Sequence, residues 1–284
     1  MATQRIGILH PGEMGISIAA SAKNSGCDVY WTSEGRSAAT RERAANVGLH
    51  EVPALAELCN QCGVIISVCP PHAAEALAHE VMRTGFRGLY VEANAIAPQR
   101  TIQIGETMTK ADVRFVDGGI IGMPAWKPHS TCLYLSGPRA NEVAACFSAG
   151  PLDTKVLGTE IGKASAVKMC YAANTKGAVA LLAAIIATAE NLGVREALFE
   201  QWRHDDPQFP EQVQKRIQAN TPKAWRFVGE MGEISRTFRE AGAPGEFHAA
   251  AANIYERLAR FKDSRTPPTL EEILAALTEA VPAK

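Results

Sequence analysis

The sequence has almost no net charge, because 29 Lys and Arg residues stand against 30 Asp and Glu residues, which gives a formal charge of -1. A nucleic acid or an acidic membrane selects a strongly basic surface, so the charge balance gives no reason to expect either partner. The sequence also lacks an apolar run of the roughly 20 residues that a membrane span needs. Its most apolar stretch, Gly177 to Ala187, is shorter. We therefore expect a small-molecule substrate, with no nucleic acid and no membrane as partner.

Signals for metal binding and secretion are also scarce. Cys59-Asn60-Gln61-Cys62 is a CxxC pair, but no second ligand pair at a suitable spacing accompanies it. We interpret these thiols as small residues at a helix end and predict no metal. Seven Cys is an odd number, and Met1-Ala2-Thr3-Gln4-Arg5 leads into a strand-like segment without a signal peptide. We expect reduced thiols and a cytoplasmic protein.

The sequence does contain a long alternation of strands and helices. Its 284 residues, 46% of them hydrophobic, are enough for one large domain or two domains of ordinary size. Strands are expected at 5–9, 27–32, 64–68, 88–92, 113–117 and 131–136, with helices at 16–25, 37–47, 72–84 and 98–109 between them. This alternation predicts an α/β domain, residues 1–158, with a mainly parallel, doubly wound sheet.

Strand signals end at about residue 155, and the remaining sequence predicts an all-α domain, residues 159–284. It opens with Glu160 to Val194, a Pro-free stretch of good helix formers that predicts one long helix. The second half of this helix is apolar on every side, which is typical of a buried core or a subunit interface. We therefore predict at least a dimer. Further helices are expected at 194–203, 208–219, 222–241, 246–261 and 269–280.

The turn after the first strand carries the clearest chemical signal. Dinucleotide sites use G-x-G-x-x-G there, because glycines permit a tight turn and let the pyrophosphate approach the backbone at a helix N-terminus. The sequence reads His10-Pro11-Gly12-Glu13-Met14-Gly15, so His replaces the first Gly. The strand before it and the helix after it favour a dinucleotide site over a bare turn of an α/β fold. The cofactor-binding residues predicted here are His10, Pro11, Gly12, Glu13 and Met14.

The end of the second strand, Ser33-Glu34-Gly35-Arg36-Ser37, should select the cofactor. An acid at this place binds the ribose hydroxyls of NAD, whereas Arg accommodates the 2′-phosphate of NADP. Glu34 is a candidate for the NAD acid. Arg36 between two serines is the better phosphate cradle, since a guanidinium can grip phosphate in a bidentate manner. We predict NADP, held by Ser33, Glu34, Arg36 and Ser37, with NAD as the alternative.

Four stretches resemble the β-hydroxyacid dehydrogenase superfamily, which includes 6-phosphogluconate and 3-hydroxyisobutyrate dehydrogenases. They are RIGILHPGEMG at 5–15, SVCPP at 67–71, VEANAIAPQ at 91–99, which is similar to D-x-S-T-x-x-P, and GKASAVKMCYAANTKG at 162–177, which is similar to G-x-G-x-x-x-K-x-x-x-N. SEGRS and DGGIIG look most like a branch that carries the domain of unknown function 1932. The resemblance implies an N-terminal Rossmann-like domain, an all-α C-terminal domain, hydride transfer, and a homodimer or homotetramer.

The resemblance also implies that Lys168 is the catalytic residue. Hydride transfer at an alcohol carbon must be coupled to movement of the hydroxyl proton, and a Lys in a dry cleft has a pKa lowered toward working pH. The alternative is a Lys that extends from its helix into solvent. Cys69, Pro70 and Asn94 follow two neighbouring strands at their carboxyl ends, where ligands of α/β proteins bind, so we expect them next to the cofactor.

Two departures from the family pattern concern the substrate. The family's D-x-x-x-S-G-G loop aligns with 117–123, where Ile121 replaces the Ser and is followed by Gly122 and Met123. The family Asn four residues after the Lys is Ala172. The resemblance makes these four positions substrate-contacting. Tyr171 and Thr175 are candidates to replace the lost Asn, and Lys176 to reach a substrate anion. His248, at a helix start, is a weaker candidate that equally fits a helix cap or the core.

Together these residues predict an NADP-dependent oxidoreductase that acts on a β-hydroxy acid or a related hydroxy or oxo compound. Because the carboxylate-binding Ser is absent, an imine or ketone reductase of the same fold is an alternative. A dinucleotide-binding sensor without turnover is a second alternative, which needs the first domain but not Lys168.

Overall fold

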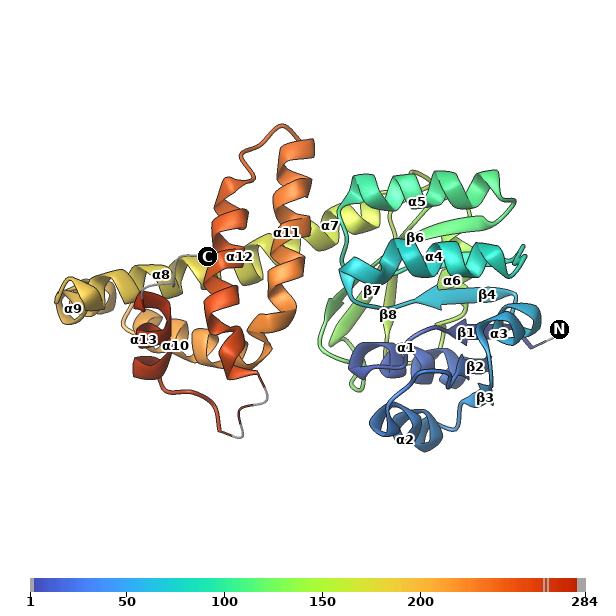
Figure 1. Cartoon of the computed structure of the whole chain (residues 1–284), viewed down its shortest axis with the longest axis horizontal. Helices are drawn as coiled ribbons and strands as arrows, with labels where there is room; N and C mark the ends of the chain where they lie inside the picture. The colour runs from blue at the N-terminus through green and yellow to red at the C-terminus, as the bar shows by residue number, and fades with distance from the viewer. Residues whose placement is uncertain (1–2, 263, 265, 280–284) are drawn as a thin grey trace. The chain divides into compact units, whose positions relative to one another are not determined.

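The computed structural model describes residues 3–262, 264 and 266–279 (Figure 1). The chain forms two compact units, Met1–Met169 and Cys170–Lys284. The first unit is the predicted Rossmann-like α/β domain and the second is helical. The first unit extends past residue 158, the predicted end of the domain, because it includes the first turns of the helix α7 (Lys163–Ala172).

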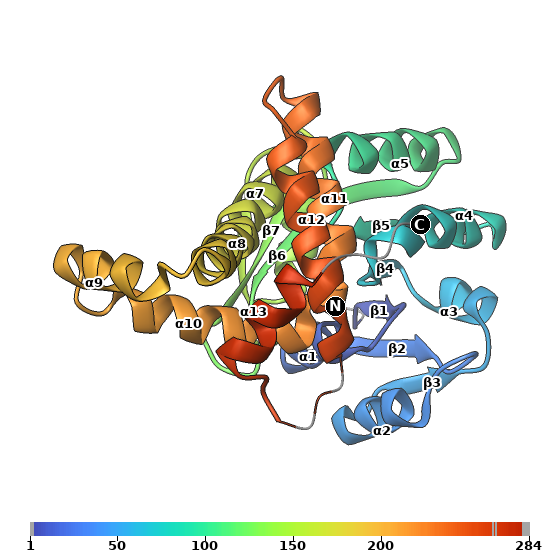
Figure 2. The ribbon, with the colours of Figure 1, turned by 60° about the vertical axis from the view of Figure 1, so that its left-hand side comes forward.

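The first unit is built on one eight-stranded sheet in the order β3-β2-β1-β4-β5-β6-β7-β8 (Figure 2). All neighbours are parallel except β6 and β7, which pair antiparallel. The strands are β1 (Arg5–Ile8), β2 (Asp28–Thr32), β3 (His50–Val52), β4 (Val64–Ser67), β5 (Leu89–Glu92), β6 (Arg114–Gly122), β7 (Thr131–Ser136) and β8 (Asp153–Val156). The chain leaves β1 in one direction and returns through β4 in the other, so the carboxyl ends of β1 and β4 flank a switch point of the kind at which α/β proteins bind ligands.

Helices cover both faces of this sheet and bury two separate apolar cores (Figure 1). One face carries α1 (Glu13–Asn24), α2 (Ala38–Val47) and α6 (Ala140–Ala145), and the other carries α3 (Leu55–Gln61), α4 (Ala74–Arg83) and α5 (Pro98–Lys110). Strand residues such as Ile6 and Ile66 face the first core, and Ile65 and Tyr90 face the second. The alternation along each strand therefore divides its side chains between two buried layers, as a doubly wound sheet requires.

Four short elements were not predicted: β3, β8, α3 and α6. The strand β3 reads His-Glu-Val and β8 reads Asp-Thr-Lys-Val, so neither has the apolar run that identifies a buried strand. Both lie at the ends of the strand order, where one edge faces no partner strand. The CxxC pair lies where it was expected, at the end of α3, with both thiols buried.

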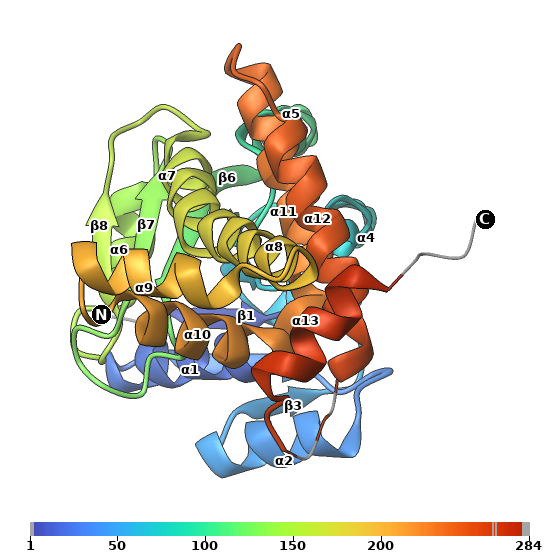
Figure 3. The same cartoon turned by 90° about the vertical axis from the view of Figure 1, so that its left-hand side faces the viewer.

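The second unit contains α8 (Ala178–Asn191), α9 (Arg195–Asp205), α10 (Phe209–Asn220), α11 (Ala224–Glu240), α12 (Glu246–Leu258) and α13 (Leu270–Thr278). The helices α11 and α12 run antiparallel as a hairpin (Figure 3). The predicted long helix exists, but it is not uniform, because a π-helical turn, Ala173–Gly177, joins α7 to α8. Tyr255 Oη donates to the carbonyl oxygen of Lys176 in this turn at 2.8 Å, which satisfies a carbonyl of the widened turn.

The continuous helix Lys163–Asn191 is long and apolar enough to cross a membrane by length and composition alone, with a mean hydropathy of 1.5 over its most apolar window. Soluble core helices pass the same test. Two of its residues, Leu181 and Ile185, are not buried within the chain, and Leu181 is 44% exposed. The composition of the apolar half predicted that it would be covered on every side. Within one chain this cover is incomplete.

Candidate active site

The turn between β1 and α1 has the geometry of an anion-binding helix start. Gly12 caps α1 with extended backbone angles and, being a Gly, has no side chain to accept a hydrogen bond from the first turn. A Cβ placed on Gly12 would meet nothing within 4 Å, so the space in front of the helix is open. A Cβ on Gly15 would lie 2.1 Å from the carbonyl oxygen of His10. Gly15 therefore packs the helix against the strand, and Gly12 leaves room for a phosphate.

Two polar atoms beside this turn are buried without a hydrogen-bond partner among the described residues: His10 Nδ1 and Arg36 Nε. Burial, followed by the charge of Arg36, lowers the pKa of His10 to about 4, so its ring is neutral at pH 7. Burial also lowers the pKa of Arg36, whose charge acts on Cys69 across the edge of the sheet. Unpaired buried donors are costly, and a bound phosphate or ribose would pair them.

The other predicted residues of this segment differ from one another in burial and bonding. Ser37 caps α2, and its Oγ accepts from the amide of Thr40 at 3.3 Å. Ser33 is buried, while Glu34 is exposed. The sequence analysis missed Arg43, which lies one turn into α2 and donates to the carbonyl oxygen of Pro11 at 3.4 Å. It is a second guanidinium next to the phosphate turn.

The ends of β4 and β5 are tied together by the side chain of Asn94. Its Oδ1 accepts from the amide of Cys69 and its Nδ2 donates to Ser67 Oγ at 2.9 Å. Asn94 is 3% exposed. Both ends of the amide hold two strand ends at a fixed separation, and the predicted contact of Asn94 with the cofactor stays a prediction. Burial raises the pKa of the Cys69 thiol to about 12, so it stays protonated.

Two buried carboxyl groups stand side by side at this edge, because Glu92 of β5 and Asp117 of β6 are register partners. Glu92 Oε1 accepts from the amide of Asn94 at 3.1 Å. Burial raises the pKa of Glu92 to about 8, and the neighbouring Asp117 adds to this rise. Two adjacent carboxyl groups away from water do not ionise together easily, so Glu92 is neutral at pH 7.

Lys168 lies in the first unit, on α7, where that helix crosses β6. A Cβ on Gly119 would lie 3.1 Å from Lys168 Cβ and 2.5 Å from the carbonyl oxygen of Ala164. Only a Gly at this strand position allows the helix to approach so closely. The Lys168 side chain is half-buried. The Lys168 side chain therefore begins at a close contact with β6, which lies two strands from β4 in the sheet.

Residues 5–149, just over half of the chain, match the model of the NAD binding domain of 6-phosphogluconate dehydrogenase. The chain belongs to this family. Residues 189–258 match DUF1932, a domain of unknown function. Both matches confirm the superfamily and the branch that the sequence motifs indicated.

Several known proteins are similar to this 6-phosphogluconate dehydrogenase-like chain. An uncharacterized 28.5 kDa protein of Methanothermus fervidus is 28% identical over 196 residues, which cover 69% of this chain and 75% of that protein. A conserved protein of unknown function, whose structure reveals similarity with 3-hydroxyacid dehydrogenases, is 29% identical with a TM-score of 0.68, over 90% of this chain and 97% of that one.

Two enzyme structures share the fold at lower identity. The 3-hydroxyisobutyrate dehydrogenase of Mycobacterium tuberculosis, solved with L-serine, is 15% identical with a TM-score of 0.70, over 98% of this chain and 100% of that one. The reductive aminase of Aspergillus terreus, in complex with NADPH and ethyl levulinate, is 17% identical with a TM-score of 0.56, over 96% and 99%. The first unit is accordingly an NAD(P)-binding domain of an oxidoreductase fold.

The predicted substrate loop of this 6-phosphogluconate dehydrogenase-like protein is largely a strand. Ile121 and Gly122 belong to β6 and pair with Cys132 and Thr131 of β7. The prediction ended this strand at residue 117 and, by the family resemblance, placed the following residues in a loop, whereas antiparallel pairing with β7 extends the strand to Gly122. Met123, 63% exposed, follows the strand end.

The remaining predicted residues lie in the second unit, and their roles toward a substrate stay predictions. Tyr171 is exposed and Ala172 is buried. Thr175 Oγ1 lies in the π-helical turn and donates to the carbonyl oxygen of Tyr171 at 3.1 Å.

Lys176 and His248 are both engaged inside the second unit. The Lys176 ammonium forms an ion pair with Glu230 and lies 4.9 Å from the centroid of the Phe227 ring. The ammonium is thus already paired with a carboxylate, and its predicted reach to a substrate anion stays a prediction. His248 is 4% exposed and packs against Gly177, and burial lowers its pKa, so it is a neutral core residue.

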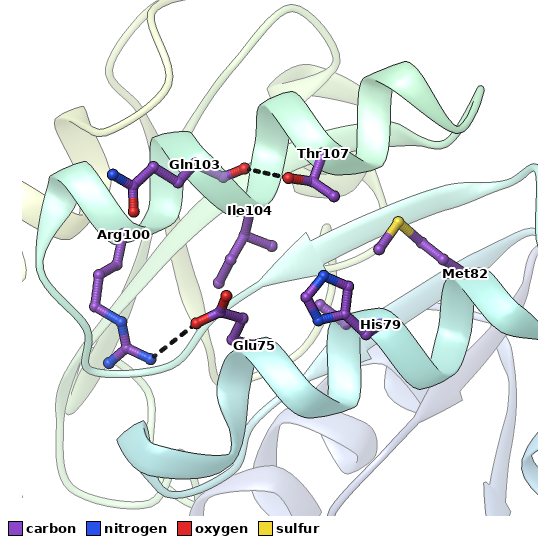
Figure 4. Close-up of a pocket in the computed structure, with 8 residues that line it drawn as sticks. Glu75, His79, Met82, Arg100, Gln103, Ile104 and Thr107 are labelled. Carbon is purple, nitrogen blue, oxygen red and sulfur yellow. Dashed lines mark hydrogen bonds and ion pairs between the residues drawn. The ribbon is translucent and has the colours of Figure 1, made fainter.

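A small cavity of about 50 Å³ lies apart from these residues, between α4 and α5 (Figure 4). Glu75 and Arg100 form an ion pair across it at 4.0 Å, and His79 and Thr107 also line it. The volume suits a few water molecules. It is too small for a dinucleotide.

Proposed function

We propose that this protein is an NADP-dependent oxidoreductase that transfers hydride between the nicotinamide and a β-hydroxy acid or a related hydroxy or oxo compound. The observation that carries the proposal is the open N-terminus of α1 at Gly12, beside the unpaired Arg36 Nε and His10 Nδ1. Donors left unpaired at a helix N-terminus suit the phosphates and ribose of a dinucleotide.

The residues present fit this cofactor in two parts. The helix start and Pro11 would hold the pyrophosphate, and Arg36 with Ser33, Ser37 and Arg43 would hold the 2′-phosphate. When bound, the nicotinamide supplies or accepts the hydride. Lys168 takes the hydroxyl proton in the oxidation direction and returns it in the reduction direction.

Calorimetric titration of NADP(H) and NAD(H) into the wild type tests the cofactor part. We expect the tighter binding for NADP(H). Equal affinity for both cofactors, or no binding of either, would contradict it. A spectrophotometric screen of hydroxy acids and oxo acids, with Lys168→Ala as the blank, then tests turnover.

A reductase of imines or ketones is the second candidate. It is favoured by Ile121, an apolar side chain at the position that the family pattern gives to a carboxylate-binding Ser, and by the fold shared with the reductive aminase. Ketones offered with and without an amine distinguish it from the first candidate. Binding of NADP(H) with no turnover in either screen would instead favour a cofactor sensor.

We also propose that the protein is a cytoplasmic homodimer or homotetramer, in contact through α8 and α9. An open apolar hollow on these helices is lined by Ala184, Ile185, Thr188, Ala189, Leu192, Val194 and Leu198. Leu192 is 68% exposed and Val194 is 48% exposed. Exposed apolar patches of this kind mark association surfaces. Light scattering at micromolar concentration that gave the monomer mass of about 30.4 kDa would refute the assembly.

A further inference from the structure

Asp117 is the most heavily bonded side chain of the first unit, although the sequence singles it out only as the start of a loop. It is completely buried. Its two carboxylate oxygens accept hydrogen bonds from Ser136 Oγ at 2.9 Å, Gly162 N at 2.9 Å, Ala164 N at 3.0 Å, Ser165 N at 3.1 Å and Ser165 Oγ at 2.6 Å.

Three of these donors are backbone amides at the start of α7. The first amides of a helix have no partner within the helix, and a carboxylate placed before them both satisfies them and complements the helix dipole. Here the carboxylate comes from β6 and not from the helix itself. Asp117 therefore fastens the N-terminus of α7 to the sheet.

Further contacts hold the same turn. Ser136 Oγ accepts from the amide of Ala164 at 3.1 Å, and Ser165 Oγ is 2.9 Å from Thr101 Oγ1 of α5. Ala164 and Lys168 are four residues apart and so lie on one face of α7. Both contact the sheet at Gly119, two residues beyond Asp117 on the same strand. The first turn of α7 and the Cβ atom of Lys168 thus both contact the same strand, β6.

A second buried carboxyl group, that of Glu92, stands beside Asp117. Burial raises the pKa of both Asp117 and Glu92. The donors around Asp117 oppose this rise, whereas the pKa of Glu92 reaches about 8. The first amides of α7 therefore face the carboxyl group that has more hydrogen-bond donors, and these donors favour its charged form.

We propose that Asp117 is the positioning residue for Lys168: its carboxylate, bonded to the first amides of α7, fixes where the Lys168 ammonium stands at the carboxyl edge of the sheet. The inference rests on the proposed function, in which Lys168 moves the substrate proton. Asp117 itself touches neither substrate nor cofactor in this role.

The test uses the full-length Asp117→Asn variant and two readouts that need no substrate. Hydrogen exchange should become roughly tenfold faster, or more, at the amides of 162, 164 and 165, because each loses a bond to a charged acceptor. Limited acetylation, read by mass spectrometry, should change at Lys168 relative to the exposed Lys110. With a substrate in hand, turnover should fall at least about tenfold while the dissociation constant for NADP(H) stays within about twofold.

Gly119→Ala gives the same test with Asp117 intact, in case the Asn variant does not fold. Its methyl group would push α7 away from β6, so the reactivity of Lys168 should change again. Gly105→Ala is the matched control. Its methyl group would lie 2.9 Å from the Phe115 ring, a close contact in the same unit that involves a side chain and not α7. It should leave the reactivity of Lys168 unchanged.

The outcomes separate the two proposals. If Asp117→Asn leaves both the exchange of the α7 amides and the reactivity of Lys168 as in the wild type, Asp117 does not position Lys168. If Gly105→Ala alters Lys168 as much as Gly119→Ala does, the effect is general destabilisation and the inference is wrong. A wild type that binds no dinucleotide overturns the proposed function alone, and the exchange and labelling results still decide the role of Asp117.

Discussion

The carboxyl edge of the sheet has two halves that treat their polar groups in opposite ways. The open half, after β1 and β2, contains His10, Gly12 and Arg36, and leaves an imidazole nitrogen and a guanidinium nitrogen unpaired. The closed half, at the ends of β4 to β6, contains Asn94 and Asp117, whose side chains are bonded at both ends. Glu92 beside them accepts one hydrogen bond at Oε1, while its Oε2 has no partner among the described residues. Polar groups without partners are stabilised by a ligand, whereas fully bonded ones hold geometry.

The comparison predicts different results for substitutions in the two halves. Changes in the open half should lower cofactor affinity with little loss of stability. Changes in the closed half, and in the helix that it fastens, should alter turnover or stability with little effect on affinity.

Lys168→Ala is expected to have the largest effect. Loss of a positioned acid/base costs about 10² to 10⁴ in rate, while the dissociation constant for NADP(H) should stay nearly unchanged. Lys168→Arg should fail as well, because a guanidinium does not deprotonate at working pH. Lys163→Ala, an exposed Lys on the same helix, is the control for charge. Steady-state kinetics that show near-wild-type turnover for the Ala variant would remove Lys168 from the mechanism.

Glu92→Gln should change how stability depends on pH. The folded state keeps the Glu92 proton up to about pH 8, whereas the unfolded chain releases it near 4.5. The free energy of unfolding of the wild type should therefore fall as pH rises from about 4.5 to 8, by up to about 1.4 kcal/mol per pH unit. The Gln variant should lack this slope and gain on the wild type at pH 8. Urea titrations from pH 5 to 8 measure both.

The control for this slope is Glu75→Gln, since the Glu75 side chain is 61% exposed. Its stability should follow that of the wild type at each pH. Parallel curves for the wild type and Glu92→Gln would mean that Glu92 ionises normally, and the closed half would not contain a neutral acid.

Arg36→Ala should weaken NADP(H) by about 1.5–3 kcal/mol, the value of a hydrogen bond to a charged group, and NAD(H) by much less. The free energy of unfolding should hardly change, because Arg36 Nε has no hydrogen-bond partner among the residues that the structure describes. Calorimetry and thermal unfolding report the two quantities. A variant that lost stability but kept its preference for NADP(H) would place Arg36 among the structural residues.

The smallest effects should come from the two glycines of the phosphate turn. Gly15→Ala forces a methyl group to within 2.1 Å of the His10 carbonyl oxygen and should cost about 1–3 kcal/mol of stability. Gly12→Ala meets no protein atom within 4 Å and should leave stability alone while lowering cofactor affinity. Equal losses of stability in both variants would contradict the open space assigned to Gly12.

The fold could be predicted largely because its signals are local. Apolar runs such as Val64–Ser67 and the glycine that ends a helix at Gly48 are visible without tertiary information. The open half was predicted for the same reason, since the turn around Gly12 and the segment around Arg36 each lie within a few residues. Short-range patterns of this kind are enough to locate the exposed backbone amides and the side chains of the open half.

The closed half could not be predicted, because its contacts join residues far apart in the sequence. Asp117 bonds to Ser165, 48 residues later, and Asn94 bonds to Ser67, 27 residues earlier. Arg43 was missed for a related reason: it lies on a charged helix face, and only the fold brings it to Pro11. When the partner of a side chain is distant in the sequence, the neighbouring residues do not indicate the contact.

The two consecutive glycines of β6 make the sheet unusually thin at one point. The place of a side chain at Gly119 is filled by the backbone of α7, and at Gly118 a Cβ would lie 3.2 Å from both Ala93 Cβ and the Glu92 carbonyl oxygen. No flexible side chain of β6 separates the helix from the strand or the strand from the next loop. A small displacement of α7 would therefore be transmitted to Glu92 and Ala93 through closely packed backbone, because no side chain at this crossing can change its rotamer to absorb it.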